Sequence, residues 1–347
     1  MNRLAFLLIL LGYSALLTAQ NSHHRNYDAV PPGTTKAFNV HFTHDMSSPN
    51  SWKVVVIKGQ ENGPVFTIVA GIHGYEYPPI LATQKIIQEL DPKKLKGTVL
   101  IVPIANPGSF FHRSPYKNPI DDRNLNRIFP GKSNGTVTER MAYFMSNTII
   151  PYSDVFLDIH SGDAPEDLMP FVCYYNNKKR PEQTALARRL SEKSGFKTVV
   201  SYPYSLSKKA RAKYAFKQAV QHGITGLSIE CGKMGQVEAD EVERIRKAIF
   251  NMLYEMGMYT EHFPLPEQLQ YLDDQIYLKS TVDGIFYSEQ KAGDKVNKGQ
   301  LVGYTTDLLG ETIEEYKAPK DGIILYKLAT PPINRDETVM CISSVAE

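Results

Sequence analysis

A histidine and a glutamate three residues apart follow an apolar run, in the segment Gly71-Ile72-His73-Gly74-Tyr75-Glu76. Imidazole nitrogens and carboxylate oxygens are ligands that zinc accepts, and ligands in open α/β sheets lie beyond the carboxyl ends of the strands. Such a pair also arises by chance. His41 and His44 form a competing pair, but they lie in a polar segment without a buried strand before them and stay unassigned. We therefore take His73 and Glu76 as candidate metal ligands.

A second apolar strand also ends in a histidine, in the segment Val155-Phe156-Leu157-Asp158-Ile159-His160. A catalytic zinc site needs three protein ligands, and His160 is the candidate for the third. Side chains two residues apart on a strand point to the same face, so Asp158 and His160 share one. Asp158 is then placed to accept a hydrogen bond from a ligand histidine. The alternative is that Asp158 caps a neighbouring turn.

Three further polar groups could take part in hydrolysis. Glu230 ends the predicted strand 226–229, where a carboxylate can take a proton from the attacking water; a lone glutamate at a strand end is otherwise exposed or salt-bridged. Asn126 and Arg127 lie among turn residues, and arginine binds carboxylates through two parallel hydrogen bonds. Arg113 lies upstream in a proline-rich loop. For any one arginine the alternative is an ordinary surface residue.

The elements that must position these residues alternate between strands and helices. This alternation over 51–263 predicts an α/β domain with a parallel or mixed sheet covered on both faces. The preceding residues 20–50 are polar, with the turn Pro31-Pro32-Gly33, and are predicted to form an irregular lead-in. The predicted strands are 52–58, 65–72, 97–104, 155–159, 171–175 and 226–229, and the predicted helices are 78–90, 137–150, 181–194, 213–221 and 237–256.

Residues 268–347 have no helical periodicity and are predicted to form a small all-β domain. Short β runs are separated by turn sequences such as Asp283-Gly284 and Lys291-Ala292-Gly293-Asp294. The pattern resembles a lipoyl or biotinyl carrier barrel. A carrier needs a lysine at the hairpin tip after Gly303, and residues 305–311 contain none. We therefore expect no covalent carrier function, and expect this domain to border the site.

The first residues have the layout of a secretory signal peptide. Arg3 precedes an apolar run over 4–17, and cleavage is expected after Ala19. An uncleaved anchor is the alternative, although the run is short for a bilayer span. No later stretch is long and apolar enough to span a membrane, so we expect a secreted or periplasmic protein with no membrane span after cleavage of residues 1–19.

Composition excludes other classes of protein. The formal net charge of +2 comes without a concentrated basic run, which argues against a nucleic-acid partner. The chain has three cysteines, which lack the close spacing of a metal knuckle. We expect them to be small buried side chains. They are Cys173, Cys231 and Cys341.

Taken in order, four motifs resemble the succinylglutamate desuccinylase/aspartoacylase family of the zinc carboxypeptidase clan. The resemblance runs from about residue 50 to the end. It implies a zinc-carboxypeptidase-like mixed sheet covered by helices, and one Zn²⁺ per chain held by His73, Glu76 and His160. The motifs are Gly71-Ile72-His73-Gly74-Tyr75-Glu76, Asn124-Leu125-Asn126-Arg127-Ile128-Phe129-Pro130-Gly131, Asp158-Ile159-His160 and Ile229-Glu230-Cys231-Gly232.

The resemblance also implies roles for the other candidates. Glu230 matches the general base and acid, and Asn126 and Arg127 match the residues that hold the substrate carboxylate. Arg113 matches an arginine that polarises the scissile carbonyl. Asn124 stands where the deacylases of acidic amino acids commonly have aspartate, so their substrate specificity is not transferred.

Three functions follow from these observations. The first is a zinc hydrolase that cleaves the amide bond of an N-acyl amino acid or a similar small carboxylate. The second is a secreted metallocarboxypeptidase acting on peptides or peptidoglycan stems, which the same site would serve. The third is an inactive binding module, which would need no zinc.

Overall fold

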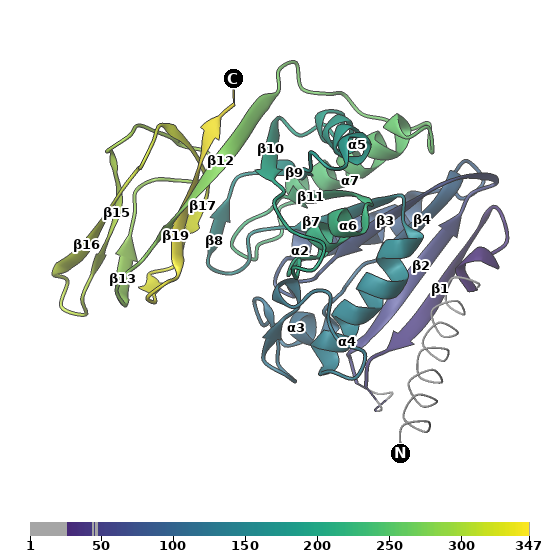
Figure 1. The fold of residues 1–347 in the computed structure, drawn as a ribbon, viewed down its shortest axis with the longest axis horizontal. Helices are drawn as coiled ribbons and strands as arrows, with labels where there is room; N and C mark the ends of the chain where they lie inside the picture. The colour runs from purple at the N-terminus through teal and green to yellow at the C-terminus, as the bar shows by residue number, and fades with distance from the viewer. Residues whose placement is uncertain (1–25, 44, 46–47, 347) are drawn as a thin grey trace.

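The computed structural model describes residues 26–43, 45 and 48–346. A thirteen-stranded mixed sheet runs through this part of the chain, in the order β1-β2-β4-β3-β7-β11-β9-β10-β12-β19-β17-β14, with β8 paired to β17. Its α/β part comprises β1 (Thr34–His41), β2 (Ser51–Lys58), β3 (Glu61–Ala70), β4 (Lys96–Val102), β7 (Val155–His160), β8 (Glu166–Leu168), β9 (Phe171–Asn176), β10 (Thr198–Pro203) and β11 (Thr225–Glu230). The mixed α/β fold predicted from the sequence is confirmed (Figure 1).

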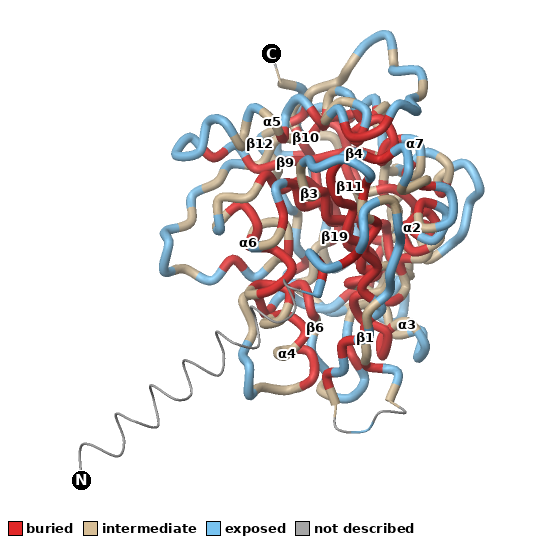
Figure 2. The backbone as a smooth tube through the Cα atoms, turned by 90° about the vertical axis from the view of Figure 1, so that its right-hand side faces the viewer, coloured by how far each residue is buried: buried red, intermediate tan, exposed pale blue. Residues whose placement is uncertain are grey.

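Helices cover both faces of this sheet, because its strands alternate two apolar sets of side chains. On one face, Ile68 of β3 and Leu157 of β7 belong to a core shared with α2 (Tyr77–Glu89), α5 (Pro181–Glu192) and α7 (Ala239–Glu255). On the other face, Val69 and Phe156 pack with α4 (Val137–Phe144) and α6 (Ala215–His222). Figure 2 shows the buried residues gathered along the central strands. All five predicted helices are present, whereas β10 was not predicted.

Shorter elements complete the α/β part. α4 continues into a π-helical turn (Met145–Ile149) and a 3-10 turn (Ile150–Tyr152) before β7. The loop that crosses the carboxyl ends of the strands contains α3 (Pro107–Phe111), the small sheet of β5 (Lys117–Asn118) and β6 (Arg123–Asn124), and a 3-10 turn (Leu125–Arg127).

The N-terminal segment differs from the prediction. Residues 20–50 were predicted to be irregular, but Thr34–His41 forms β1 and pairs antiparallel with β2 along its whole length. β1 is an edge strand whose residues are mostly exposed and polar, so the sequence lacks the apolar alternation that marks a half-buried strand. The backbone pairing with β2, rather than side-chain burial, defines this element.

The C-terminal β region extends the main sheet. β12 pairs parallel with β10, and β19, β17 and β14 follow, so hydrogen bonding is continuous from the α/β part into this region. A second sheet of four strands packs on it through its own apolar core. The strands are β12 (Gln270–Lys279), β13 (Gly284–Tyr287), β14 (Lys295–Val296), β15 (Leu301–Thr306), β16 (Thr312–Lys317), β17 (Gly322–Leu328), β18 (Pro332–Ile333) and β19 (Thr338–Val345).

Two sequence expectations concern termini and cysteines. The signal peptide predicted at residues 1–19 lies outside the described residues. Within the described part, no helix combines the length and the apolar character needed to cross a bilayer. Cys173, Cys231 and Cys341 are buried and free, as expected of small core residues.

Candidate active site

The carboxyl ends of two neighbouring parallel strands bring the first candidate ligands together. β3 and β7 pair in parallel, with Ala70 opposite Ile159, so His160 at the end of β7 lies beside the turn that follows β3. In that turn Gly71 takes the left-handed conformation, with φ of 66°. Glu76 is the N-cap residue of α2 and makes no capping hydrogen bond with its side chain. Its carboxylate is therefore available to the two histidines.

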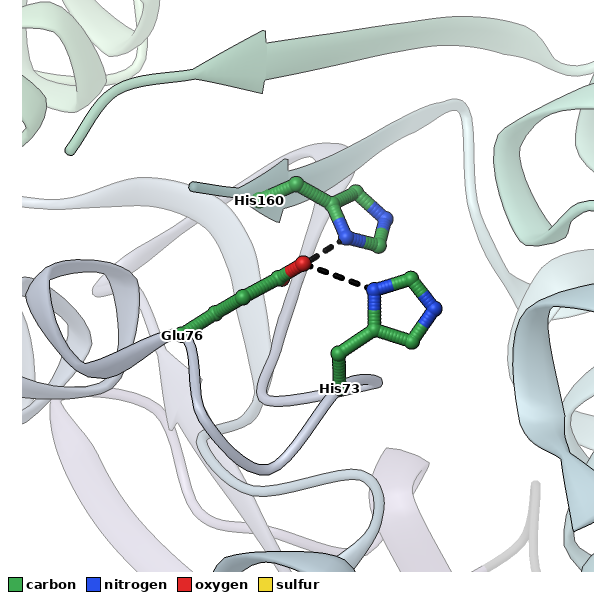
Figure 3. A group of neighbouring side chains, drawn as sticks. All are labelled: His73, Glu76 and His160. Carbon is green, nitrogen blue, oxygen red and sulfur yellow. Dashed lines mark hydrogen bonds and ion pairs between the residues drawn. The ribbon is translucent and has the colours of Figure 1, made fainter. Parts of the chain in front are cut away.

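His73, Glu76 and His160 form a compact cluster (Figure 3). The Nδ1 atom of His73 lies 2.7 Å from Glu76 Oε1, and the Nδ1 atom of His160 lies 2.9 Å from Glu76 Oε2. One ligand atom from each of the three residues lies within 4.8 Å of the others. Glu76 and His160 are buried, and His73 is half-buried. The group can hold one metal ion.

The electrostatics of the cluster fit a cation. Burial by itself raises the pKa of Glu76, but attraction to His160 and His73 outweighs burial and lowers this pKa to about 2. Burial lowers the pKa of His160, but the carboxylates of Asp158 and Glu76 raise it well above its ordinary value. The carboxylates thus favour positive charge between the two Nδ1 atoms. Two histidines and one glutamate are a donor set of catalytic zinc sites.

The outer nitrogen of each histidine faces a fixed acceptor. Asp158 Oδ1 lies 3.1 Å from His160 Nε2, and Asn124 Oδ1 lies 3.2 Å from His73 Nε2. Acceptors at Nε2 favour the tautomer that carries hydrogen there, which leaves both Nδ1 lone pairs for a metal. Asp158 thus lies beside His160, and its role as the acceptor for this ligand stays a prediction. The contact of Asn124 with His73 was not predicted, because it joins loops 51 residues apart in the chain.

Removing these acceptors should weaken metal binding. Asn124→Ala and Asp158→Asn are each expected to lower zinc affinity by about 10- to 100-fold, the usual effect of losing a partner of a ligand histidine. Competition with a chromogenic chelator measures this affinity. Asn297→Ala, in an exposed turn of the C-terminal region, is the control. Unchanged zinc affinity in both site variants would show that these contacts do not orient the ligands.

Glu230 lies next to the cluster at the end of β11. β11 pairs in parallel with β7 and places Glu230 opposite His160. Burial raises the pKa of Glu230 to about 8; the carboxylates of Glu76, Glu166 and Asp158 add to the increase, and His160 opposes it. A carboxyl group with a pKa near neutrality can both accept and donate a proton at physiological pH. Glu230 therefore lies on the strand next to that of His160, and its role as general base stays a prediction.

The predicted carboxylate-binding pair divides into one fixed and one accessible side chain. Asn126 is 7% exposed, its Oδ1 accepts the Ala215 N–H at 2.9 Å, and its Nδ2 lies 3.4 Å from His160 Nε2. The exposed Arg127 donates to the backbone oxygen of Asn126 and lies over the Tyr214 ring, 5.0 Å from its centroid. Arg127 can meet a ligand directly, whereas the Asn126 amide is already held by the protein. Substrate binding by either residue stays a prediction.

Arg113 is not brought into the cluster. It is exposed, has φ of 50°, and lines an apolar groove over α2 and α3 beside Tyr77, Phe110 and Phe111. None of the contacts described for Arg113 reaches a side chain of the cluster. Its predicted action on a scissile carbonyl gains no support from this position.

Two acidic residues near the cluster were missed by the sequence analysis. Asp163 follows His160 by three residues and is 1% exposed, and Glu166 begins β8. Burial raises the pKa of both carboxyl groups, and the negative charge of Glu76 adds to the effect. The available signal was a carboxylate in the Gly162-Asp163 turn directly after the second ligand strand.

Known proteins resemble this chain in sequence and in fold. The family model of the succinylglutamate desuccinylase/aspartoacylase catalytic domain matches residues 62–256. A Halomonas elongata protein named N-alpha-acetyl-L-2,4-diaminobutyric acid deacetylase is 31% identical over 303 residues, covering 85% of this chain and 86% of the relative.

Solved structures show the same fold at lower identity. A succinylglutamate desuccinylase/aspartoacylase from Rhodobacter sphaeroides has a TM-score of 0.80 at 20% identity. The match covers 92% of this chain and 98% of the Rhodobacter chain. The product-bound ectoine utilization protein EutE (DoeB) from Ruegeria pomeroyi has a TM-score of 0.79 at 24% identity. The match covers 91% of this chain and 98% of the Ruegeria chain. With the family-model match and the 31% identical relative, the chain belongs to the succinylglutamate desuccinylase/aspartoacylase family.

Proposed function

We propose that the protein is a zinc-dependent deacylase that hydrolyses the amide bond of a small N-acyl amino acid. The observation that carries this proposal is the convergence of His73 Nδ1, His160 Nδ1 and the Glu76 carboxylate in a member of a deacylase family. The Halomonas relative, named for the deacetylation of an N-acetylated amino acid, supports the substrate class. A zinc ion held by these residues supplies Lewis acidity and lowers the pKa of water.

Glu230 supplies the proton transfers in the proposed mechanism. The register of β11 against β7, with Glu230 opposite His160, supports this role. Glu230 accepts a proton from the attacking water and then donates one to the nitrogen of the leaving amine, so one group serves as base and acid. This sequence of steps uses the ability of Glu230 to change protonation state near neutral pH.

Arg127 orients the substrate through its carboxylate. The guanidinium is exposed and, among the described residues, makes no ion pair within 4.0 Å. Its contact with the Tyr214 ring and its hydrogen bond to the Asn126 backbone oxygen support a fixed position for the guanidinium, whose planar fork can bind a carboxylate through two hydrogen bonds. The substrate's reacting carbonyl is then presented to the cluster in one orientation.

Arg127→Ala is therefore expected to raise KM for an N-acyl amino acid by roughly 10- to 100-fold, the loss of a charged hydrogen bond. Arg127→Lys should recover only part of this loss, because lysine keeps the charge without the fork. Steady-state kinetics measure KM for both variants. Arg123→Ala, which removes another exposed arginine nearby, is the control. An unchanged KM in Arg127→Ala would remove Arg127 from substrate binding.

A substrate panel tests the proposed function. Purified protein supplied with zinc is assayed for release of free amine from N-acetyl amino acids and from short peptides, with and without a chelator. The proposal predicts turnover of N-acetyl amino acids that stops on chelation. Turnover of peptides alone would instead identify a carboxypeptidase. A folded, zinc-loaded protein that releases amine from neither class would indicate a binding module.

A further inference from the structure

An apolar groove of about 440 Å³ lies over α2 and α3, apart from the residues of the metal cluster. Its lining includes Ile80 and Leu81 of α2, Phe110 and Phe111 of α3, and Val237. Phe111 is 64% exposed and Val237 is 50% exposed, so the apolar wall of the groove faces solvent. An exposed apolar patch of this kind marks a place where another molecule binds.

Arg113 gives the lining of this groove a positive charge. The residue is exposed, and among the described residues its side chain makes no ion pair within 4.0 Å. Binding partners present apolar groups to apolar surfaces and opposite charges to one another. The molecule that fits this groove should therefore combine apolar side chains with a negative charge.

The same chain carries a segment of this chemistry in the turn between β15 and β16, which we call the hairpin tip (residues 307–311). Leu308 and Leu309 are 86% and 90% exposed, so nearly all of both side chains lies in solvent. Asp307 precedes the two leucines, and the exposed Glu311 follows them after one glycine. The hairpin tip is thus apolar and acidic, which complements the groove.

Hydrogen bonds hold the hairpin tip in one conformation. The Oδ1 atom of Asp307 accepts the N–H groups of Leu309 and Glu311, each at 2.9 Å. Gly310 takes the left-handed conformation, with φ of 93°, which closes the turn. Because the backbone of the two leucines is already fixed, little conformational freedom is lost when they enter a groove. The hairpin tip is therefore preorganised for binding.

The hairpin tip and the groove of one chain lie far apart. Figure 1 shows β15 and β16 at one end of the longest axis of the molecule, away from α2 and α3. Both surfaces are also exposed in the single chain, so the hairpin tip does not fill its own groove. The two complementary surfaces can meet only between two copies.

We propose that the groove over α2 and α3 receives the hairpin tip of a second copy of this chain. Leu308 and Leu309 pack against the apolar wall, and the acidic residues of the hairpin tip lie near Arg113. In a two-fold dimer each copy contributes one groove and one hairpin tip, so the contact is made twice. The inference does not depend on the proposed deacylase function.

Sedimentation velocity of the full chain tests this self-association. The patch is small, so the mass should rise reversibly from monomer to dimer as the protein concentration increases to about 1 mM. Leu308→Ser/Leu309→Ser and Arg113→Glu should each weaken the dimer about tenfold or more. Leu301→Ser, which removes another exposed leucine of β15, is the control and should leave the dimer unchanged.

The substituted side chains are all exposed, so the variants should fold, and circular dichroism checks this. A wild-type protein that stays monomeric at the highest concentration would overturn the proposal. A dimer that neither the tip variant nor the groove variant weakens would overturn it as well. Vesicle binding by a monomeric wild type, lost in Leu308→Ser/Leu309→Ser, would assign the hairpin tip to a lipid surface instead.

Cross-linking between two variants identifies the surfaces directly. Leu308→Cys places a thiol in the hairpin tip and Val237→Cys places one in the groove, while the native cysteines are buried. A short bis-maleimide reagent should join the two variants in a mixture, and tags of different mass distinguish the mixed product. Ile120→Cys, exposed outside the groove lining, replaces Val237→Cys in the control and should give little mixed product. Equal cross-linking to both positions would overturn the proposed contact.

Discussion

Glu230→Gln is expected to lower kcat by about 10²- to 10⁴-fold, the usual contribution of a positioned general acid and base. The amide keeps the shape of the side chain, but it can neither accept a proton from water nor donate one to the leaving amine. Zinc content should stay at the wild-type level, because Glu230 is not one of the three clustered ligands. Amine release measures kcat, and metal analysis of the same sample measures its zinc content.

The control for Glu230 is a carboxylate of the same type away from the site. Glu238 is exposed at the N-cap of α7, and Glu238→Gln should keep full turnover. Wild-type kcat in Glu230→Gln would remove Glu230 from the mechanism. Loss of zinc together with activity would instead give Glu230 a role in holding the metal.

His160→Ala and Glu76→Gln are expected to abolish both stoichiometric zinc binding and turnover. Each removes one of three ligand atoms that lie within 4.8 Å of one another, and a catalytic zinc site needs all three. Because the cluster joins two buried groups of opposite charge, each substitution also leaves a buried group without its partner. Circular dichroism is needed to show that the variants remain folded.

An exposed histidine provides the comparison for these variants. His262 stacks on the ring of Tyr254 at the surface, with ring centroids 4.2 Å apart, and His262→Ala should keep one zinc per chain. Full zinc occupancy in folded His160→Ala would show that the metal is held by other residues.

The central part of the site followed from the sequence because three strand ends carry it. The apolar runs before His73, His160 and Glu230 identify buried strands, and buried parallel strands deliver their carboxyl ends to one edge of the sheet. Period-two alternation also placed Asp158 on the same face as His160, and their side chains lie 3.1 Å apart. Local patterns were sufficient wherever a strand fixes the direction of the side chain.

The remaining features depend on loops and on edges, where local patterns carry less information. Asn124 meets His73 through a turn whose path the sequence does not specify. Arg113 was assigned from resemblance alone, and its loop places it in the groove over α2 and α3. β1 escaped prediction because an exposed edge strand is held by backbone pairing with β2.

The central claim, a catalytic zinc held by His73, Glu76 and His160, is tested most directly on the wild-type protein. Native mass spectrometry and amine release are measured on the same samples after chelation and after zinc is restored. We predict one zinc per chain, with amine release lost on chelation and recovered in proportion to the zinc that rebinds. A folded protein that binds no zinc, or that releases amine at the same rate without it, would contradict this claim.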